Sequence, residues 1–346
     1  MCGLGGVMRF GLFIPQGWRH DLVGIEPDQH WGVMAGLARR ADGIRDWESI
    51  WVYDHFHPTP HPTEEAVHEA WSLMAAFAGV TGRVRIGQMC TCMSYRNPAY
   101  LAKVAATVDV ISEGRLEMGI GAGWYEHEWR AYGYGFPGAG ERLERLREGV
   151  EIFRQMWTTG RATLDGKHYQ VDGAMCFPKP LQGTAFEGSE RSGIPMWIAG
   201  GGERKTLRIA AEYADYTNFA GGDPEVFTHK SEILKQHCAD LGRDFDTITR
   251  SSNFNVVIGR NDKEVQERLA WVEQHLRGAG VPDEVVGRTM ETYRTGPAVG
   301  TPDQVASALA DLQDLGMTYA ITNFVESAYD LSGVELFERE VIPALR

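Results

Sequence analysis

Ionisable side chains follow directly after an apolar, strand-forming run near position 50. Residues 50–53 read IWVY, and Asp54, His55 and His57 come next, before two prolines that forbid further sheet. Because an imidazole titrates near neutral pH, His55 is a candidate to exchange a proton with a substrate, and Asp54 is a candidate to orient it. The alternative explanation is that these residues only end a strand.

Glycines end another strand-like run. Gly119, Gly121 and Gly123 alternate in GIGAGW, so one face of the strand end carries no side chains, and a flat ligand can approach the backbone there. Tyr125 and His127 follow within four residues of the last glycine. The alternation predicts one wall of a ligand pocket.

Three consecutive glycines, Gly200, Gly201 and Gly202, follow Ala199 at the end of the run IPMWIA and open a helix-like stretch. Backbone amides without partners at a helix N-terminus attract phosphate groups, and the helix dipole strengthens the attraction. The alternative is a flexible loop with glycine at the helix cap, but three glycines exceed what capping needs. The pattern therefore favours a phosphate site.

The end of the third strand-like run also has an unusual composition. Residues 84–89, VRIGQM, lead into the small and polar residues of CTCMSYRNP. A bulged strand end that leads to a helix capped near Asn97, with Pro98 in its first turn, explains this composition without any ligand. The functional alternative is a pocket wall in which the backbone presses against a ligand.

Asp54, His55 and His57 are also a conceivable metal site, since metal-dependent barrel hydrolases use strand-end His and Asp residues. Such hydrolases usually carry an HxH pair on the first strand, whereas the first strand here runs into Ile14 and Pro15. The sequence has no HExxH, CxxC or Walker-type GxxxxGK[ST] motif. The metal hydrolase is therefore the weaker enzyme hypothesis.

The elements that must position these residues alternate between strand and helix, with no Gly/Pro-rich linker between them. Strands are expected at residues 9–14, 49–53, 84–89, 115–120, 194–199, 215–219, 251–259 and 319–324, and helices at 29–46, 66–79, 98–112, 141–157, 203–213, 225–241, 262–278 and 302–315. Strict alternation requires a parallel sheet with helices outside it. Because no GxGxxG turn follows the first strand, the α/β class expected is a (β/α)8 TIM barrel, whose active site lies where the strands end.

The whole chain, residues 1–346, is expected to form one barrel domain with insertions near 161–193 and 279–300. Residues 161–171 predict a β-hairpin that turns at Asp165 and Gly166. The irregular segment 172–193 suits a lid over the barrel mouth, and residues 279–300 are a second candidate cover.

The bulk composition restricts the partners. A formal net charge of −13 argues against nucleic acid or an acidic membrane surface as the main partner, but it does not exclude an anionic cofactor. An odd number of cysteines, five, and the lack of a long apolar run predict reduced thiols in a cytoplasmic protein without a membrane span. The N-terminus lacks the pattern of a secretory signal, and translation is expected to start at Met1 or at Met8.

Taken together, these stretches resemble the bacterial luciferase-like flavin and deazaflavin oxidoreductases. The resemblance is carried by RFGLFIPQ, SIWVYDHF, DVISEGRLEMGIGAGW and IPMWIAGGG, and it continues through VGTPDQVASALADLQDLGMTYAI to the C-terminus. In detail the chain is most similar to members that use coenzyme F420, a 5-deazaflavin that carries two electrons as a hydride. The resemblance implies a (β/α)8 barrel with the tricyclic ring in the barrel mouth.

The resemblance also implies roles for individual residues. In related structures a non-proline cis peptide after the third strand lies behind the ring, and here that bond would join Met89 and Cys90. The strand-two pair falls on Asp54 and His55, near the pyrimidine side and the reacting face of the ring. The residues expected to act in catalysis are His55 and Asp54, and those expected to contact the cofactor are Asp54, Met89, Cys90, Thr91, Gly121, Gly123, Tyr125, His127, Ala199, Gly200, Gly201 and Gly202.

One departure from the family pattern bears on the substrate. The F420-dependent glucose-6-phosphate dehydrogenases carry a catalytic glutamate just after the strand-four glycines, where this chain has Trp124. We therefore expect a flatter or more apolar small molecule than a sugar phosphate: an imine, a ketone, an activated alkene or a nitroaromatic compound. The implied activity is hydride transfer between F420 and such a molecule, in a homodimer. The alternatives are an FMN-dependent monooxygenase and a flavin-binding paralogue without turnover.

Overall fold

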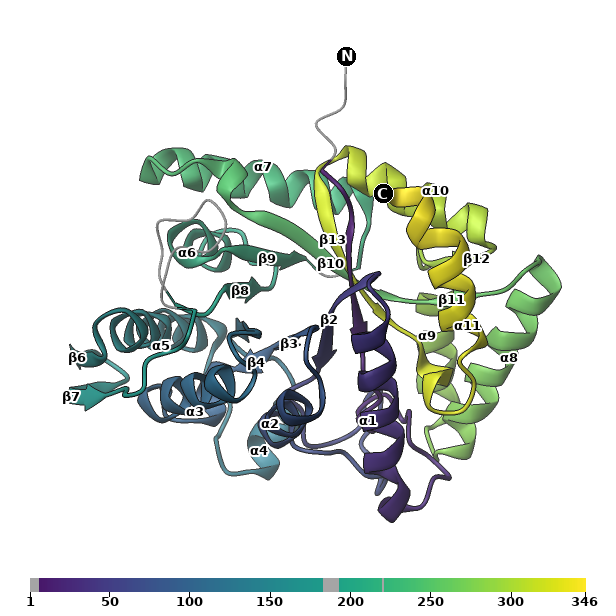
Figure 1. The fold of residues 1–346 in the computed structure, drawn as a ribbon, viewed down its shortest axis with the longest axis horizontal. Coiled ribbons are helices and arrows are strands. Elements are labelled where there is room, and N and C mark those ends of the chain that lie inside the picture. The colour runs from purple at the N-terminus through teal and green to yellow at the C-terminus, as the bar shows by residue number, and fades with distance from the viewer. Residues whose placement is uncertain (1–5, 183–192, 220) are drawn as a thin grey trace. The chain divides into compact units, whose positions relative to one another are not determined.

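The computed structural model describes residues 6–182, 193–219 and 221–346. Within these ranges the chain is a (β/α)8 barrel, as the alternation of strand and helix predicts. Its eight strands, most of them labelled in Figure 1, are β1 (Arg9–Phe13), β2 (Trp47–Val52), β3 (Arg85–Gln88), β5 (Leu116–Gly121), β8 (Met196–Ala199), β9 (Tyr216–Phe219), β10 (Thr249–Asn255) and β13 (Met317–Asn323).

Contacts within the chain divide it into two compact units. Unit 1 comprises Met1–Glu69, Phe219–His229 and Arg250–Arg346, and unit 2 comprises Ala70–Asn218 and Lys230–Thr249. Asp54 and His55 therefore belong to unit 1, whereas the glycines at strand ends and the Met89–Cys90 bond belong to unit 2.

In unit 1, β1 pairs in parallel with β2 on one side and with β13 on the other, and β13 pairs with β10. The register aligns Leu12 with both Ile50 and Thr322. The other elements of this unit are α1 (Pro27–Gly43), β11 (Val257–Ile258), α8 (Asp262–Gly278), α9 (Asp283–Arg294), β12 (Val299–Gly300), α10 (Pro302–Asp314) and α11 (Ser332–Leu336), with short turns of helix at Val325–Ala328, Phe337–Val341 and Ile342–Leu345. Helix α9 packs on α8 through Val286 and Met290, which are fully buried.

In unit 2, β5 pairs in parallel with β3, with the short strand β4 (Thr91–Cys92) and with β8, and β8 pairs with β9. The buried Glu117 ties these strands together, because the Trp197 indole donates to its Oε2 at 2.6 Å and Arg85 pairs with its other oxygen. The helices are α2 (Ala70–Val80), α3 (Pro98–Ile111), α4 (Glu126–Ala131), α5 (Ala139–Thr159) and α6 (Thr206–Tyr213), with short turns at Met93–Tyr95 and Phe245–Thr247. Helix α7 (Pro224–Leu241) has its first residues in unit 1 and the rest in unit 2.

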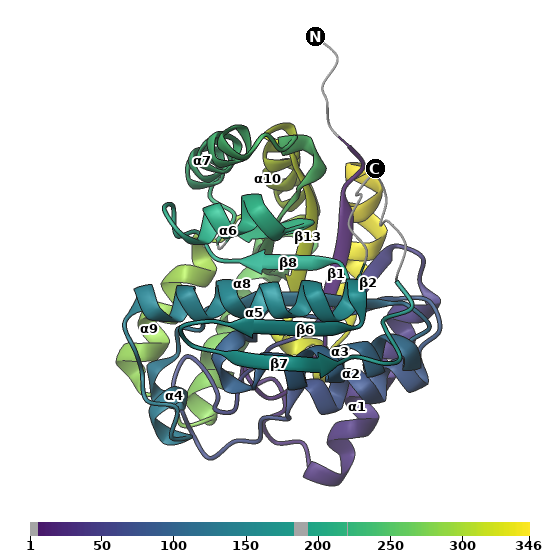
Figure 2. The same cartoon turned by 90° about the vertical axis from the view of Figure 1, so that its left-hand side faces the viewer.

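The predicted hairpin is confirmed. β6 (Arg161–Asp165) and β7 (Gln170–Met175) pair antiparallel, and Figure 2 shows the hairpin running along α5. It extends beyond the expected end at residue 171, as far as Met175. The predicted lid, 172–193, lies partly outside the described residues, because 183–192 are not among them. The second predicted cover, 279–300, contains α9, and its role as a cover stays a prediction.

Three other boundaries compare with the prediction as follows. Helix α3 begins at Pro98 with the Asn97 side chain accepting from the Tyr100 amide, as predicted. The expected strand 251–259 is wrong in its second half, because β10 ends at Asn255 and residues 257–258 pair with β12 instead. The helix expected from residue 66 begins only at Ala70, and the His68 amide before it donates to the Gln16 carbonyl at 3.0 Å.

Two further properties concern the described residues as a set. None of their helices combines the length and apolar character that crossing a membrane requires. The four cysteines they include, Cys90, Cys92, Cys176 and Cys238, are not in disulfides, as the expectation of reduced thiols predicts for these four.

Candidate functional site

In unit 1, Asp54 and His55 lie two and three residues beyond the end of β2. Asp54 is almost completely buried, with 2% of its surface exposed, whereas His55 is half-buried. The imidazole of His55 stacks face to face on the indole of Trp18, with ring centroids 4.4 Å apart and planes 5° from parallel. Trp18 in turn contacts the Tyr53 ring, with ring centroids 3.9 Å apart. The orientation of His55 is therefore fixed by an aromatic stack that begins in the loop after β1.

The amide of Gln16 holds this loop against the end of β2. Its Oε1 accepts from the Tyr53 amide at 2.8 Å, and its Nε2 donates to the carbonyls of Tyr53 and His68, each at 2.7 Å. A carboxamide is the side chain suited to this contact, because it both accepts and donates along a strand edge. Gln16 therefore fixes the backbone one residue before Asp54.

Gly17 and Asp21 complete the loop after β1. Gly17 has φ +95°, and a Cβ atom there would lie 1.7 Å from the Ala66 carbonyl oxygen, so only glycine fits. The Asp21 carboxylate accepts from the amides of Gln16 and Gly17 at 3.2 and 2.6 Å. Burial raises the pKa of Asp21 to about 6, although the two amides oppose the shift.

In unit 2, the peptide bond between Met89 and Cys90 is cis, as the family resemblance predicts. It lies between β3 and β4, where the Thr91 hydroxyl donates to the Gln88 Oε1 atom at 2.7 Å. The parallel register places Thr91 opposite Ile120, and Ile120 opposite Ile198. The structure therefore brings Cys90, Gly121 and Ala199, three of the predicted cofactor contacts, to one set of adjacent strand ends.

The glycines at the end of β5 and just beyond it, Gly119, Gly121 and Gly123, meet neighbouring atoms of the protein at the positions where their side chains would be. A Cβ atom on Gly119 would lie 1.8 Å from the Gln88 carbonyl oxygen. On Gly121 it would lie 2.7 Å from the Cys90 sulfur, and on Gly123 it would lie 2.5 Å from the Cys92 sulfur. The space without side chains is thus filled by the neighbouring segment rather than left for a ligand. The assignment of Gly121 and Gly123 as cofactor contacts stays a prediction.

Aromatic residues follow these glycines. Trp124 is 60% exposed and stacks on Tyr125, with ring centroids 5.2 Å apart. Burial raises the pKa of the Tyr125 hydroxyl to about 12, and the nearby Glu128 carboxylate adds to the shift, so this hydroxyl stays protonated at neutral pH. His127 is exposed in α4, 5.9 Å from the Tyr125 ring. Trp124 therefore offers an open, flat apolar surface beside the strand ends of unit 2.

The loop after β8 has donors available for an anion. Gly200 has φ +115°, and its amide donates to the Asn218 carbonyl at 3.1 Å. In the described part of the chain, the amides of Gly201 and Gly202 have no protein acceptor. A Cβ on Gly202 would lie 2.7 Å from the Thr206 hydroxyl, so that hydroxyl lies directly beside the loop. Two available amides and one hydroxyl are the kind of donor set that binds a phosphate group.

A cation beside this loop was not predicted from the sequence. The Lys230 side chain of α7 passes over Gly201, whose Cβ position lies 3.4 Å from the Lys230 Cε atom. The ammonium donates to Glu203 Oε1 at 2.5 Å, and the Lys230 side chain is only 18% exposed. No local pattern links Lys230 to the glycines almost thirty residues earlier, whereas Thr206 was detectable as the first residue of a helix after a glycine run.

The alternative of a metal site receives no support from the geometry. Among residues 6–182, 193–219 and 221–346, no three His, Cys, Asp or Glu side chains form a group that could hold a metal ion.

Comparison with known proteins identifies relatives of this chain by sequence. Residues 8–319 match the family described as luciferase-like monooxygenase. An F420-dependent glucose-6-phosphate dehydrogenase of Amycolatopsis mediterranei is 34% identical over 320 residues, which cover 86% of this chain and 90% of the relative. The pyrimidine monooxygenase RutA of Stutzerimonas stutzeri is 27% identical over 308 residues, which cover 80% of this chain and 79% of the relative.

A solved structure adds a likeness in fold alone. An F420-dependent secondary alcohol dehydrogenase, in complex with an F420-acetone adduct, superposes with a TM-score of 0.77 at 22% identity and covers 99% of this chain and 100% of its own. The family match spans well over half of the sequence, and the dehydrogenase relative exceeds 30% identity over most of it. The chain belongs to the luciferase-like monooxygenase family.

Proposed function

We propose that the chain is an F420-dependent oxidoreductase that transfers a hydride between the deazaflavin and a small organic substrate. The observation that carries the choice of cofactor is the 34% identity to an F420-dependent glucose-6-phosphate dehydrogenase over 86% of this chain. The donors of the loop after β8 support a cofactor with a phosphate group, because Gly201, Gly202 and Thr206 offer two amides and a hydroxyl.

When bound, F420 supplies or accepts the hydride, and the protein supplies position and proton transfer. Gly201, Gly202 and Thr206 would hold the phosphate, and Lys230 would balance its charge. On the substrate side, the His55 imidazole would give or take the proton that accompanies hydride transfer. The stack on Trp18 holds that imidazole in one orientation, and Asp54 would orient it or the cofactor ring.

The substrate class follows from Trp124. An exposed indole stacked on Tyr125 presents a flat apolar face, which suits an imine, a ketone, an activated alkene or a nitroaromatic compound better than a sugar phosphate. The F420-dependent glucose-6-phosphate dehydrogenases carry a catalytic glutamate at the place that Trp124 occupies here.

A side-by-side titration with F420 and FMN tests the cofactor. The expected result is F420 binding in the micromolar range or tighter, with FMN weaker. The identity to pyrimidine monooxygenase RutA favours a second candidate, an FMN-dependent monooxygenase. If FMN bound at least about ten times more tightly than F420, a difference of about 1.4 kcal/mol, the F420 assignment would be wrong and this second candidate would replace it.

Replacing Lys230 by Gln should weaken binding of the phosphate-bearing deazaflavin about five- to tenfold, because a partly buried cation beside an anion contributes roughly 1 kcal/mol. Binding of the dephosphorylated deazaflavin should not change, since it has no charge for the ammonium to balance. Fluorescence titration of both ligands measures the two constants. Lys235→Gln, on the same helix, is the matched control, because its ammonium faces the Phe245 ring at 6.0 Å instead of the glycine loop. Equal losses for both ligands would show that Lys230 acts on the fold and not on the phosphate.

A further inference from the structure

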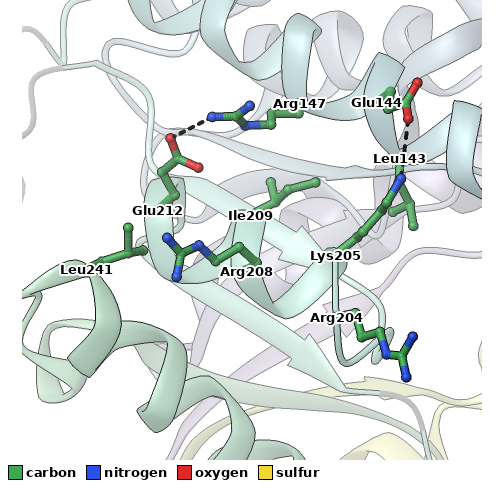
Figure 3. A pocket seen from close by; sticks show the side chains of 9 residues that line it. All are labelled: Leu143, Glu144, Arg147, Arg204, Lys205, Arg208, Ile209, Glu212 and Leu241. Carbon is green, nitrogen blue, oxygen red and sulfur yellow. Dashed lines mark hydrogen bonds and ion pairs between the residues drawn. The ribbon is translucent and has the colours of Figure 1, made fainter.

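Each of the two units contains a cavity, and the two cavities are opposite in charge. Figure 3 shows the one in unit 2, beside α5 and α6, whose lining includes the cations Arg147, Arg204, Lys205 and Arg208. A cavity of about 290 Å³ in unit 1 has the reverse character. Beside one cation, Arg268, it is lined by the carboxylates of Glu264, Glu267, Glu326 and Asp330. We call it the acidic cavity, and its charge favours a cationic ligand.

Two segments of unit 1 form the acidic cavity. Glu264, Arg268 and Trp271 of α8 are four and three residues apart, so they share one face of the helix. Glu326 and Tyr329 come from the segment after β13, in and just beyond the turn of helix Val325–Ala328. Arg268 and Glu326 are 58 residues apart in the sequence, so only the folded chain brings the two walls together.

Arg268 is shared between several of these carboxylates. Its Nη2 atom donates to Glu264 Oε1 at 3.1 Å. Its Nη1 atom lies 3.4 Å from Glu326 Oε1 and 3.6 Å from Asp330 Oδ2. Glu326 and Asp330 therefore depend on longer contacts with one guanidinium group.

The other two carboxylates of the lining have further cationic partners. Arg260 lies 2.9 Å from Glu264. Lys263 lies 3.3 Å from Glu267. Once these pairs are set aside, Glu326 and Asp330 share Arg268, and the acidic cavity carries an excess of one negative charge.

Glu326 is the buried member of this pair, with 7% of its side chain exposed against 56% for Asp330. The hydrogen bond from Arg268 reaches its Oε1 atom at 3.4 Å. Within the described ranges, no other residue donates a hydrogen bond to its Oε2 atom. Because an oxygen of a buried carboxylate without a donor is costly, a ligand with N–H groups would be stabilised there.

A metal ion does not fit this arrangement. Among the residues that the structure describes, no three His, Cys, Asp or Glu side chains form a group that could hold one. The acidic cavity instead offers the rings of Trp271 and Tyr329, with centroids 5.6 Å apart. Aromatic faces attract organic cations and cover their methylene groups. The lining therefore suits a cation that carries an alkyl chain.

The aromatic wall is fixed by contacts within the protein. Trp271 stacks on His275, with ring centroids 4.6 Å apart, and the His275 Nε2 atom donates to the His20 carbonyl at 2.7 Å. The Tyr329 hydroxyl donates to the Val23 carbonyl at 2.8 Å. Because both acceptors lie in the loop after β1, the rings are held in position, and binding a ligand costs little further ordering.

We propose that the acidic cavity binds an alkylammonium ion. Its ammonium group donates to Glu326 and Asp330, and its alkyl chain lies against Trp271 and Tyr329. A quaternary ammonium balances the charge but has no N–H group for the Glu326 oxygen. The inference is independent of the proposed function, because neither the cofactor nor the proton transfer is assigned to these residues.

Titration calorimetry with n-butylammonium chloride at pH 8 and low salt tests this inference. The expected dissociation constant is about 1 mM or tighter. n-Butanol, which has the same chain without the charge, should bind at least about tenfold more weakly. Glu326→Gln should weaken n-butylammonium binding about tenfold, because the amide keeps an oxygen for Arg268 but carries no charge.

Glu273→Gln is the matched control on the same helix. Glu273 pairs with Arg277 and Arg294 and does not line the acidic cavity, so this variant should bind n-butylammonium as the parent does. Asp330→Asn changes an exposed side chain and should weaken binding about three- to fivefold, so it decides the question if Glu326→Gln does not fold. Melting temperatures show which variants are folded.

The pH dependence of binding is an independent readout. Burial raises the pKa of Glu326 to about 7, so this carboxyl is mostly protonated at pH 6 and mostly ionised at pH 8. n-Butylammonium stays charged over this range, so it should bind the parent about tenfold more tightly at pH 8. In Glu326→Gln the two pH values should give the same affinity.

The ionisable and charged groups around Glu326 and the aromatic wall are Arg268, Glu264, Glu267, Asp330, Tyr329, Tyr293 and His275. The hydrogen bond from Arg260 lowers the pKa of Glu264 to about 2, and burial raises the pKa of Tyr293 to about 12. Burial lowers the pKa of His275 below its ordinary 6.5. These three groups therefore leave Glu326 to titrate between pH 6 and pH 8.

Two results would overturn the inference. One is a parent protein that binds n-butanol as tightly as n-butylammonium, or binds neither. The other is full n-butylammonium affinity in every folded variant of Glu326 and Asp330. Because the titration contains no deazaflavin, either result leaves the proposed function standing.

Discussion

His55→Ala is expected to lower the single-turnover rate of hydride transfer about 10²–10⁴-fold, the usual effect of losing a general acid or base. The affinity for F420 should stay within about threefold of the parent value, because the phosphate donors of the loop after β8 are unchanged. The imidazole also stacks on Trp18, so the variant should lose roughly 0.5–1.5 kcal/mol of unfolding free energy. Cofactor dissociation constant, melting temperature and rate, measured on one preparation, separate these effects.

Two further variants sharpen this test. His55→Gln keeps a hydrogen-bonding side chain of similar length but cannot titrate, so its stability should stay nearer to the parent while turnover falls as in His55→Ala. Asp54→Asn should be milder than either if the carboxylate only orients a neighbour. A His55→Ala protein that folds, binds F420 and turns over within about threefold of the parent would show that the residue merely ends a strand.

Gly17→Ala should destabilise the protein by about 3 kcal/mol or more. The left-handed backbone at φ +95° costs an alanine roughly 1–2 kcal/mol, and the new Cβ would lie 1.7 Å from the Ala66 carbonyl, which cannot yield without moving the chain. Because Gly17 stands between Gln16 and Trp18, the same movement should displace the stack under His55 and lower turnover. The midpoint of urea unfolding and the single-turnover rate measure both consequences.

Gly24→Ala is the matched control for this prediction. Gly24 also has a positive φ, +78°, but a Cβ there would meet nothing within 4 Å. It should therefore show only the backbone cost, roughly 1 kcal/mol, and retain full turnover. Equal destabilisation of the two variants would contradict the role assigned to the contact between Gly17 and Ala66.

Local patterns were sufficient to predict the barrel and the kind of residue at each strand end. Strand-forming runs that alternate with amphipathic helical runs predict a (β/α)8 barrel. Because active sites of such barrels form where the strands end, Asp54, His55 and the glycines after β8 then become the candidate site residues. The cap at Asn97 was predictable for the same reason, since it depends on neighbours within three residues.

Contacts between distant segments were not predictable in this way. Nothing near Gln16 indicates that its amide bridges Tyr53 and His68, and nothing near Lys230 indicates that it crosses Gly201. The glycines at the end of β5 show the same limit: alternation shows that side chains are missing but not what lies where they would be. Only the fold shows that the Gln88 carbonyl and two cysteine sulfurs lie there.

The contact between Gly121 and Cys90 restricts which substitutions the sequence can accept at these two positions. An alanine at position 121 would meet the Cys90 sulfur at 2.7 Å, so it requires either a rotated Cys90 side chain or a smaller residue at position 90. Once residue 121 has gained a side chain, the return of cysteine at position 90 is in turn obstructed. The two positions are therefore coupled, and a change at one is expected to favour a change at the other.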